Sequence, residues 1–295
     1  TRRDYQHLID TLIVQTAVRR GEQAPRGATP LGDLSAADVT AADIHGFIRD
    51  LYGRCRFSQS RVKQTWQVLS ATFSSLQAAE LRDTDPCELA RRRWRGLLKA
   101  PGKTQTEQEV MEPLTVGEMF KIADAAPERF RVMFRLIAAT GMRIGEALAV
   151  QRQDVNPLKG TVTLRRALTR VSSTKTPGLI RGMKLETPKS GKSRTITLAP
   201  DVMADLEQVM ANDPASPDTW LFRRASDGQP YTYQDAYDGF KQACERIGLE
   251  GRGLHDLRRG LATALFQQGL DAKSVGLILG HSDSSVASVT MKYVQ

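Results

Sequence analysis

The stretch that decides the fold is Ala139-Thr-Gly-Met-Arg143-Ile-Gly-Glu146-Ala-Leu148. Thr140 and Gly141 predict a turn, because glycine commonly ends a helix in the left-handed conformation. We therefore expect one helix to end here and the next to start with Arg143. Arg143 and Glu146 are three residues apart and share a face of that helix, so the glutamate can orient the guanidinium. In isolation, an Arg-x-x-Glu pair is more often an ordinary ion pair.

Before this stretch the apolar residues repeat at helical spacing. Phe130, Met133, Phe134 and Ile137 predict the helix that ends at the turn, and a capping box over 115–118 predicts the helix before it. After the stretch the pattern changes to period two, which predicts strands at 161–164 and 195–198 and a third at 183–186. Helices are expected again at 202–210, 233–247, 255–268 and 272–279.

The first hundred residues carry apolar stripes at helical spacing. The stripes run from Tyr5 to Ile13, from Ile44 to Leu51 and from Val62 to Leu76. We interpret them as core faces of a small helical bundle, with Trp66 as a core residue rather than a base-stacking platform. The sequence thus predicts a helical domain at 1–103, a polar linker at 104–111 and a mixed domain at 112–295 with a small antiparallel sheet. The expected class is mostly α (α+β).

Positive charge is unevenly distributed along the chain. Lysine and arginine total 42 against 33 aspartates and glutamates, a net charge of +9, which favours a polyanionic partner without identifying it. Between 159 and 194 there are ten cations and one acid, Glu186, and a second basic run covers 82–103. Since solvated surfaces mix both signs, contact with phosphates is the better explanation of the first run. The candidate DNA-binding cations are Arg91, Arg92, Arg93, Arg165, Arg166, Arg170, Lys175, Lys184, Lys192 and Arg194.

Several other classes of function find no support in the sequence. Cys55, Cys87 and Cys244 are too far apart for a metal clip or redox pair, which favours a reducing, cytoplasmic location. No apolar run approaches the roughly 18 residues of a membrane span. We therefore expect no membrane partner. Neither an acidic metal cluster nor a glycine-rich phosphate loop is visible in the sequence.

Two further motifs lie near the carboxyl terminus. The first is Leu254-His255-Asp-Leu-Arg258, in which the histidine and the arginine share a helical face. The second is Leu277-Ile-Leu-Gly280-His281, followed twelve positions later by Tyr293. Each is weak alone, because His-x-x-Arg is common and a lone tyrosine near a terminus is normally a packing residue.

In this order the motifs resemble the tyrosine recombinase, or phage integrase, family. The matching positions are Arg143, Lys189, His255-x-x-Arg258, Gly280-His281 and Tyr293. The passages Pro30-Leu-Gly-Asp-Leu34 and Val39-Thr-Ala-Ala-Asp-Ile44 resemble the family's core-binding domain, so the likeness covers nearly the whole chain. It implies a core-binding DNA-binding domain at 1–103 and a catalytic domain at 112–295. The segment between His281 and Tyr293 is slightly longer than the family pattern, with the insertion in 284–288.

The resemblance implies site-specific recombination through a 3′-phosphotyrosyl intermediate. Tyr293 would be the nucleophile, and Arg143 and Arg258 would each offer paired donors to the phosphate. His255 would donate to the phosphate oxygens or take the phenol proton, and His281 would hydrogen-bond the phosphate.

The resemblance assigns the remaining roles as follows. Lys189 would protonate the leaving 5′ oxygen, with Lys192 as the competing candidate, and Glu146 would give structural support. No metal or nucleotide is required, because the phosphotyrosine link stores the bond energy.

The implied partner is double-stranded DNA with specific core sites, bound by a homotetramer on two sites that is a monomer or dimer when free. The integrase-like passages favour phage integration and excision, in a bacterial or phage-infected cell and associated with the nucleoid. Two alternatives are a type IB topoisomerase-like enzyme and a non-catalytic DNA-binding protein of the same fold.

Overall fold

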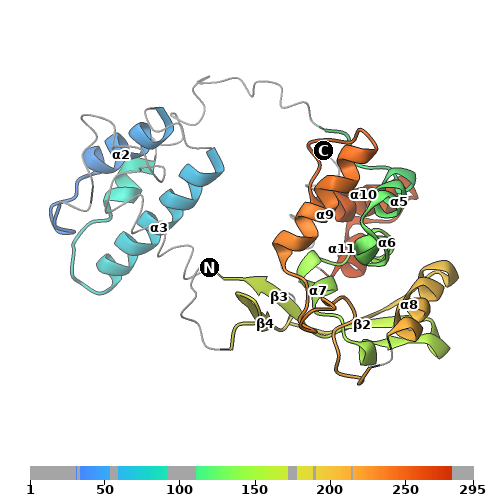
Figure 1. Ribbon diagram of the computed structural model, residues 1–295. Helices are drawn as coiled ribbons and strands as arrows, with labels where there is room; N and C mark the ends of the chain where they lie inside the picture. Colours follow the sequence, from blue (N-terminus) through green and yellow to red (C-terminus); the bar gives the residue numbers. More distant parts are fainter. Residues whose placement is uncertain are drawn as a thin grey trace. The chain divides into compact units, whose positions relative to one another are not determined.

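The computed structural model describes residues 31, 34–53, 59–91, 111–171, 178–188, 191–213 and 215–280. The chain divides into two compact units, Thr1–Val110 and Met111–Gln295, and Figure 1 labels most of their helices and strands. The apolar stripe predicted from Tyr5 to Ile13 lies outside the described residues, as does the predicted linker up to Val110.

The two longest helices described in the first unit are α2 (Ala41–Gly53) and α3 (Gln59–Ala78). A reciprocal cap precedes α2: the amide of Asp43 donates to the Thr40 hydroxyl at 3.2 Å, and the amide of Thr40 donates to the Asp43 carboxylate at 2.9 Å. The two predicted stripes on these helices are buried against each other, which confirms them as core faces. Trp66 is 8% exposed and belongs to this core, as predicted.

Arg82 belongs to the second basic run but serves the packing of this unit. Its guanidinium donates to the carbonyl oxygens of Ala36 and Val39 and lies 5.5 Å from the ring centre of Phe73. A short helical segment over 86–91 follows and ends the described residues of this unit.

Seven helices are described in the second unit: α5 (Val116–Ala125), α6 (Glu128–Thr140), α7 (Ile144–Leu148), α8 (Pro200–Asn212), α9 (Tyr233–Arg246), α10 (Leu254–Gln267) and α11 (Ala272–Leu279). The predicted capping box of α5 is present, with the Glu118 amide 3.2 Å from the Thr115 hydroxyl. The core includes Phe134, whose ring centre lies 5.8 Å from those of Phe130 and Phe240 and so joins α6 to α9. Figure 1 shows most of these helices grouped together, with the strands and α8 on another side of the unit.

The strands of this unit form two antiparallel sheets. One has the order β1 (Val155–Asn156), β2 (Thr161–Leu164), β5 (Arg194–Thr197), and the other pairs β3 (Ala167–Arg170) with β4 (Met183–Glu186). The three predicted strands are present, but β1 and β3 were not predicted. Neither has a clear alternation of apolar and polar residues: β1 has two residues, and β3 buries its first two and exposes its last two. The mostly α (α+β) class is confirmed.

Candidate functional site

The Thr140-Gly141 turn brings three helices together. Gly141 ends α6 in the left-handed conformation, with φ of 62°. A Cβ atom here would lie 2.5 Å from a methyl of Leu279 in α11 and 2.9 Å from a methyl of Leu261 in α10. Glycine is therefore required by both its backbone angle and its surroundings.

Arg143 precedes α7 and is not its first residue, which corrects the prediction. Its backbone is extended, with φ of −72° and ψ of 149°, and α7 begins at Ile144. Glu146 holds Arg143 in this position before the helix. Its carboxylate accepts hydrogen bonds from the backbone amide of Arg143 at 2.8 Å and from Nη1 of the same residue at 3.2 Å. One buried carboxylate thus caps the helix and holds the arginine side chain. On the same helix, Gly145 leaves room for the carbonyl of Leu168, which a Cβ would approach to 2.5 Å.

Arg258 and His255 lie one turn apart on α10. Arg258 is 1% exposed and donates from Nη1 to the carbonyl oxygen of Gly141 at 2.6 Å. His255 is accessible to solvent. Partial burial lowers the pKa of His255 below its ordinary value, and the positive charges of Arg258 and Arg143 lower it further. The bond from Arg258 to Gly141 lies two residues before Arg143, and His255 is one turn from Arg258 on the same helix, so the structure brings Arg143, His255 and Arg258 into one cluster.

Gly280 connects the end of α11 to this cluster. It ends the helix with φ of 69°, and its carbonyl oxygen accepts Nη1 and Nη2 of Arg143 at 3.4 and 3.5 Å. Gly280 directly precedes His281 in the sequence. Lys189, His281 and Tyr293 themselves lie outside the described residues.

Many cations of the 159–194 run are paired with acids. Arg165 and Arg166 both contact Asp154, Arg194 contacts Glu146 and Lys184 contacts Glu186. Arg170 and Lys192 have exposed side chains, as does Arg91 in the first unit. Arg92, Arg93 and Lys175 lie outside the described residues.

Sequence reasoning did not find the role of Asp154. This carboxylate is 3% exposed, accepts the Gln151 amide at 2.9 Å and binds the two arginines that precede β3. Asp154 follows Gln151 by three residues, which is the spacing of a helix-capping pair, and this pattern could have indicated a structural role for the carboxylate. The pairing of Arg194 with Glu146 spans 48 positions, so no local pattern indicates it.

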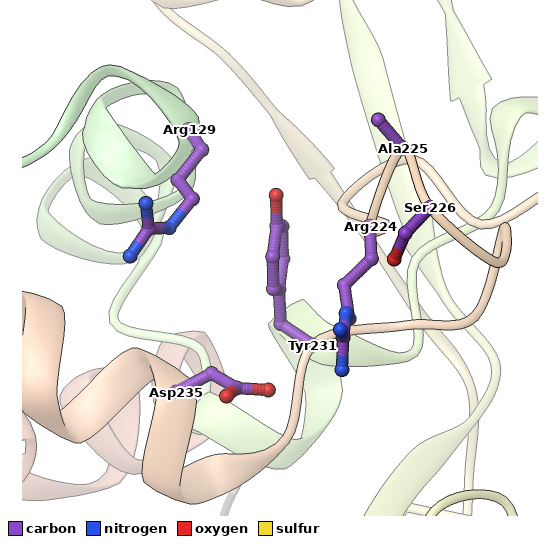
Figure 2. A pocket seen from close by; sticks show the side chains of 6 residues that line it. All are labelled: Arg129, Arg224, Ala225, Ser226, Tyr231 and Asp235. Atoms are coloured by element: carbon purple, nitrogen blue, oxygen red, sulfur yellow. The ribbon is translucent and has the colours of Figure 1, made fainter.

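A separate pocket of about 360 Å³ lies beside the start of α9 (Figure 2). Its walls include Arg129, Arg224 and Tyr231, and the Tyr231 ring stands between the two arginines. None of the predicted site residues lines it. Asp235 in its wall already accepts hydrogen bonds from Arg181 at 2.8 Å and from the Thr232 amide at 2.8 Å. The Asp235 carboxylate therefore stabilises the start of α9 and its contact with Arg181.

In the described part of the chain, no three histidine, cysteine, aspartate or glutamate side chains are arranged to hold a metal ion. That part also contains no helix with the length and apolar character needed to cross a membrane. The expectation that no metal or cofactor is used stays a prediction.

Residues 109–295 match the phage integrase family. The chain is 24% identical over 292 residues to a putative prophage phiRv2 integrase of Mycobacterium tuberculosis, covering 97% of this chain and 68% of the relative. It is 26% identical over 270 residues to the integrase of Mycobacterium phage D29, covering 89% of this chain and 65% of that integrase. It is 25% identical over 263 residues to the tyrosine recombinase XerC of Roseiflexus castenholzii, covering 85% and 74%.

Solved structures share the fold. The Tn1549 transposon integrase in complex with a circular intermediate DNA matches with a TM-score of 0.71 at 17% identity, over 90% of this chain and 84% of that one. A lambda integrase tetramer bound to a Holliday junction matches with a TM-score of 0.61 at 18% identity, over 98% and 70%.

Proposed function

The chain belongs to the phage integrase family and is a site-specific DNA recombinase, and we propose that it cuts and rejoins DNA with Tyr293 as the nucleophile. The phenol oxygen of Tyr293 attacks the phosphorus and loses its proton, and the bond to the 5′ oxygen breaks. The 5′ oxygen takes up a proton as it leaves, so the products are a 3′-phosphotyrosyl link and a free 5′ hydroxyl. Attack by the 5′ hydroxyl of a partner strand reverses these steps and joins the exchanged strands.

The observation that carries this mechanism is the cluster of Arg143, His255 and Arg258. Attack on a phosphodiester builds negative charge on the non-bridging oxygens, and fixed guanidiniums stabilise that charge. Arg143 is held by Glu146, and Arg258 is held at the carbonyl of Gly141, two positions before Arg143. Their positions are therefore set before DNA arrives.

His255 suits proton transfer in this cluster. Its pKa is lowered, so the imidazole is neutral near pH 7 and has one nitrogen that can accept a proton and one that can donate. It can then take the phenol proton or donate a hydrogen bond to the phosphate.

The two arginines differ in exposure. Arg143 keeps 28% of its side chain exposed, whereas Arg258 is 1% exposed. We infer that Arg143 makes the first contact with the phosphate and that DNA binding opens the surface over Arg258. Burial strengthens the interaction once contact is made, because the surroundings screen charge less than water does.

The leaving 5′ oxygen needs an acid. Lys189 fills this role in the proposal, and Lys192, whose side chain is exposed, is the alternative. His281 donates a hydrogen bond to the phosphate, which the position of Gly280 beside Arg143 supports.

The proposed partner is double-stranded DNA with specific core sites, and the proposed assembly is a homotetramer on two sites. The lambda integrase tetramer on a Holliday junction supports this assembly by its shared fold. Phage and prophage relatives support integration and excision, with the protein acting at the nucleoid in the cytoplasm of a bacterial or phage-infected cell.

The decisive experiment is covalent trapping. Rounds of binding with the Tyr293→Phe variant select duplexes from a random pool, and the selected duplexes are then nicked near the cleavage point. The unsubstituted protein should form a covalent adduct on these substrates that survives denaturing electrophoresis. Tyr293→Phe should bind with unchanged affinity and form no adduct.

Three other outcomes would each change the assignment. An adduct that persists with phenylalanine at 293 would show that another residue is the nucleophile. Binding without any adduct would indicate a non-catalytic DNA-binding protein. Relaxation of a plasmid that carries no selected site, without recombinant products, would indicate a type IB topoisomerase-like enzyme.

A further inference from the structure

We propose that Arg194 is a positioning residue, which fixes the guanidinium of Arg143 by holding the buried carboxylate of Glu146. The inference rests on the proposed function, because it assumes that Arg143 binds the scissile phosphate. It gives Arg194 a role other than the direct phosphate contact that the charge pattern predicts.

Four donors surround the carboxylate of Glu146. Nη1 of Arg194 lies 3.0 Å from Oε1, and Nη2 lies 2.8 Å from Oε2, which is the paired geometry of a guanidinium with a carboxylate. The amide of Arg143 and its Nη1 complete the set at 2.8 and 3.2 Å. Burial tends to raise the pKa of Glu146, but the hydrogen bonds and charge of Arg194, together with Arg143, lower it below its ordinary value. The carboxylate is therefore charged and fully occupied.

Arg194 also packs against the end of α11. A Cβ built on Gly280 would lie 2.5 Å from Nη1 and 2.7 Å from Cζ of Arg194, so the guanidinium occupies the space beside this glycine. Since Arg143 donates to the carbonyl of the same glycine, both arginines contact Gly280. Arg194 thus joins the start of β5 to α7 and to the residue before His281.

Direct contact of Arg194 with a phosphate does not fit these observations. Its side chain is 14% exposed, and each terminal nitrogen already donates one hydrogen bond to Glu146. A phosphate that drew the guanidinium away from Glu146 would leave a carboxylate that is 1% exposed without its paired partner. An uncompensated buried charge is strongly unfavourable.

Arg194→Lys tests the proposal, because lysine keeps the charge but cannot form the paired contact. Affinity for the selected duplex should stay within about twofold, with an unchanged salt dependence. The rate of adduct formation at saturating DNA should fall about 10- to 100-fold, because Arg143 loses its fixed position. Glu146→Gln should cause a similar loss, and the double variant should be no slower than the slower single variant.

The matched control is Arg223→Lys. Arg223 makes a comparable paired contact with Asp213, at 3.0 and 2.7 Å, outside the cluster. Its substitution should change neither affinity nor adduct rate. If Arg194→Lys instead weakens binding and flattens the salt dependence while the rate at saturating DNA stays constant, Arg194 is a phosphate contact and the inference is wrong.

A measurement without DNA separates this inference from the proposed function. The Nε–Hε NMR signal of Arg143, identified by its loss in Arg143→Lys, should shift in Arg194→Lys and stay in place in Arg223→Lys. An unmoved Arg143 signal in Arg194→Lys would overturn the positioning role. Failure of the unsubstituted protein to form an adduct would count against the proposed function alone.

Discussion

Arg258 donates a hydrogen bond to the carbonyl oxygen of Gly141 at 2.6 Å and so joins two motifs that lie 117 positions apart. Gly141 is the residue that ends α6, where backbone carbonyls lack helical partners and carry partial negative charge. A buried guanidinium is a strong donor for such a carbonyl. The same bond places Arg258 next to the segment that carries Arg143. The turn at Thr140-Gly141 therefore has two roles: it ends α6, and its carbonyl holds Arg258 close to Arg143.

Gly141→Ala should destabilise the second unit. Alanine at a φ of 62° costs roughly 1–2 kcal/mol, and its Cβ would lie 2.5 Å from Leu279. Overpacking of this kind adds about 1–3 kcal/mol. Urea unfolding should therefore show a loss of about 2 kcal/mol or more, and adduct formation should fall with it. The control is Gly117→Ala in α5, where no atom lies within 4 Å of the added Cβ. A comparable loss of stability in that variant would show that the left-handed backbone and close packing at Gly141 are not the cause.

Arg258→Lys should impair both folding and chemistry. Lysine cannot present a guanidinium fork, so the contact to Gly141 is weakened in a buried site, at a cost of about 1–3 kcal/mol. Removing one preorganised donor to a transition-state oxyanion typically slows a reaction by roughly 100-fold or more. Single-turnover adduct formation at saturating DNA measures this second effect. Arg246→Lys is the comparison, because Arg246 also donates to a carbonyl near a helix end, that of Ala125 at 2.7 Å, outside the cluster. Equal rates in the two variants would contradict the role given to Arg258.

The regular elements of the fold could be read from local patterns. The stripes on α2 and α3, the cap of α5 and the helix over 272–279 depend on residues close in sequence, and each was found. The two-sheet arrangement could not be read in this way. β3 and β4 are joined through register pairs such as Leu168 with Leu185, and strand pairing of this kind depends on contacts that a period-two pattern does not specify.

The basic run at 159–194 shows the limit of counting charges in a window. Only one acid lies inside the window, yet Arg166 pairs with Asp154, Arg194 with Glu146 and Arg181 with Asp235. These carboxylates come from segments up to 54 positions away and are brought in by the fold. The same limit applies to the cluster. The sequence motifs identify Arg143 and Arg258 as candidates, but only the structure shows that Arg258 contacts the carbonyl of Gly141.

His255 should titrate below its ordinary pKa of 6.5, because partial burial and the charges of Arg258 and Arg143 oppose its protonation. At pH values just below 6.5, His255 is therefore protonated to a greater extent in the unfolded chain than in the folded protein. The stability that this residue contributes is therefore complete above about pH 6.5 and is lost as the pH falls toward the folded pKa. NMR titration of the ring, assigned with His255→Gln, measures the midpoint, and bound duplex DNA should raise it because phosphates favour the charged form. A midpoint at or above 6.5 in the free protein would contradict the electrostatic description of the cluster.

DNA affinity should fall steeply with salt, and the exposed cations of the 159–194 run should account for part of that dependence. Each phosphate contact contributes about 0.9 to the slope of log affinity against log salt. Arg170→Ala removes an exposed charge, so it should reduce the slope by about that amount and leave the unfolding free energy within about 0.5 kcal/mol. Arg166→Ala removes a partner of the buried Asp154 and should cost about 1–3 kcal/mol of stability. Fluorescence anisotropy over a salt series, with urea unfolding of the same samples, separates the two effects. An unchanged slope in Arg170→Ala would show that this side chain does not contact the DNA backbone.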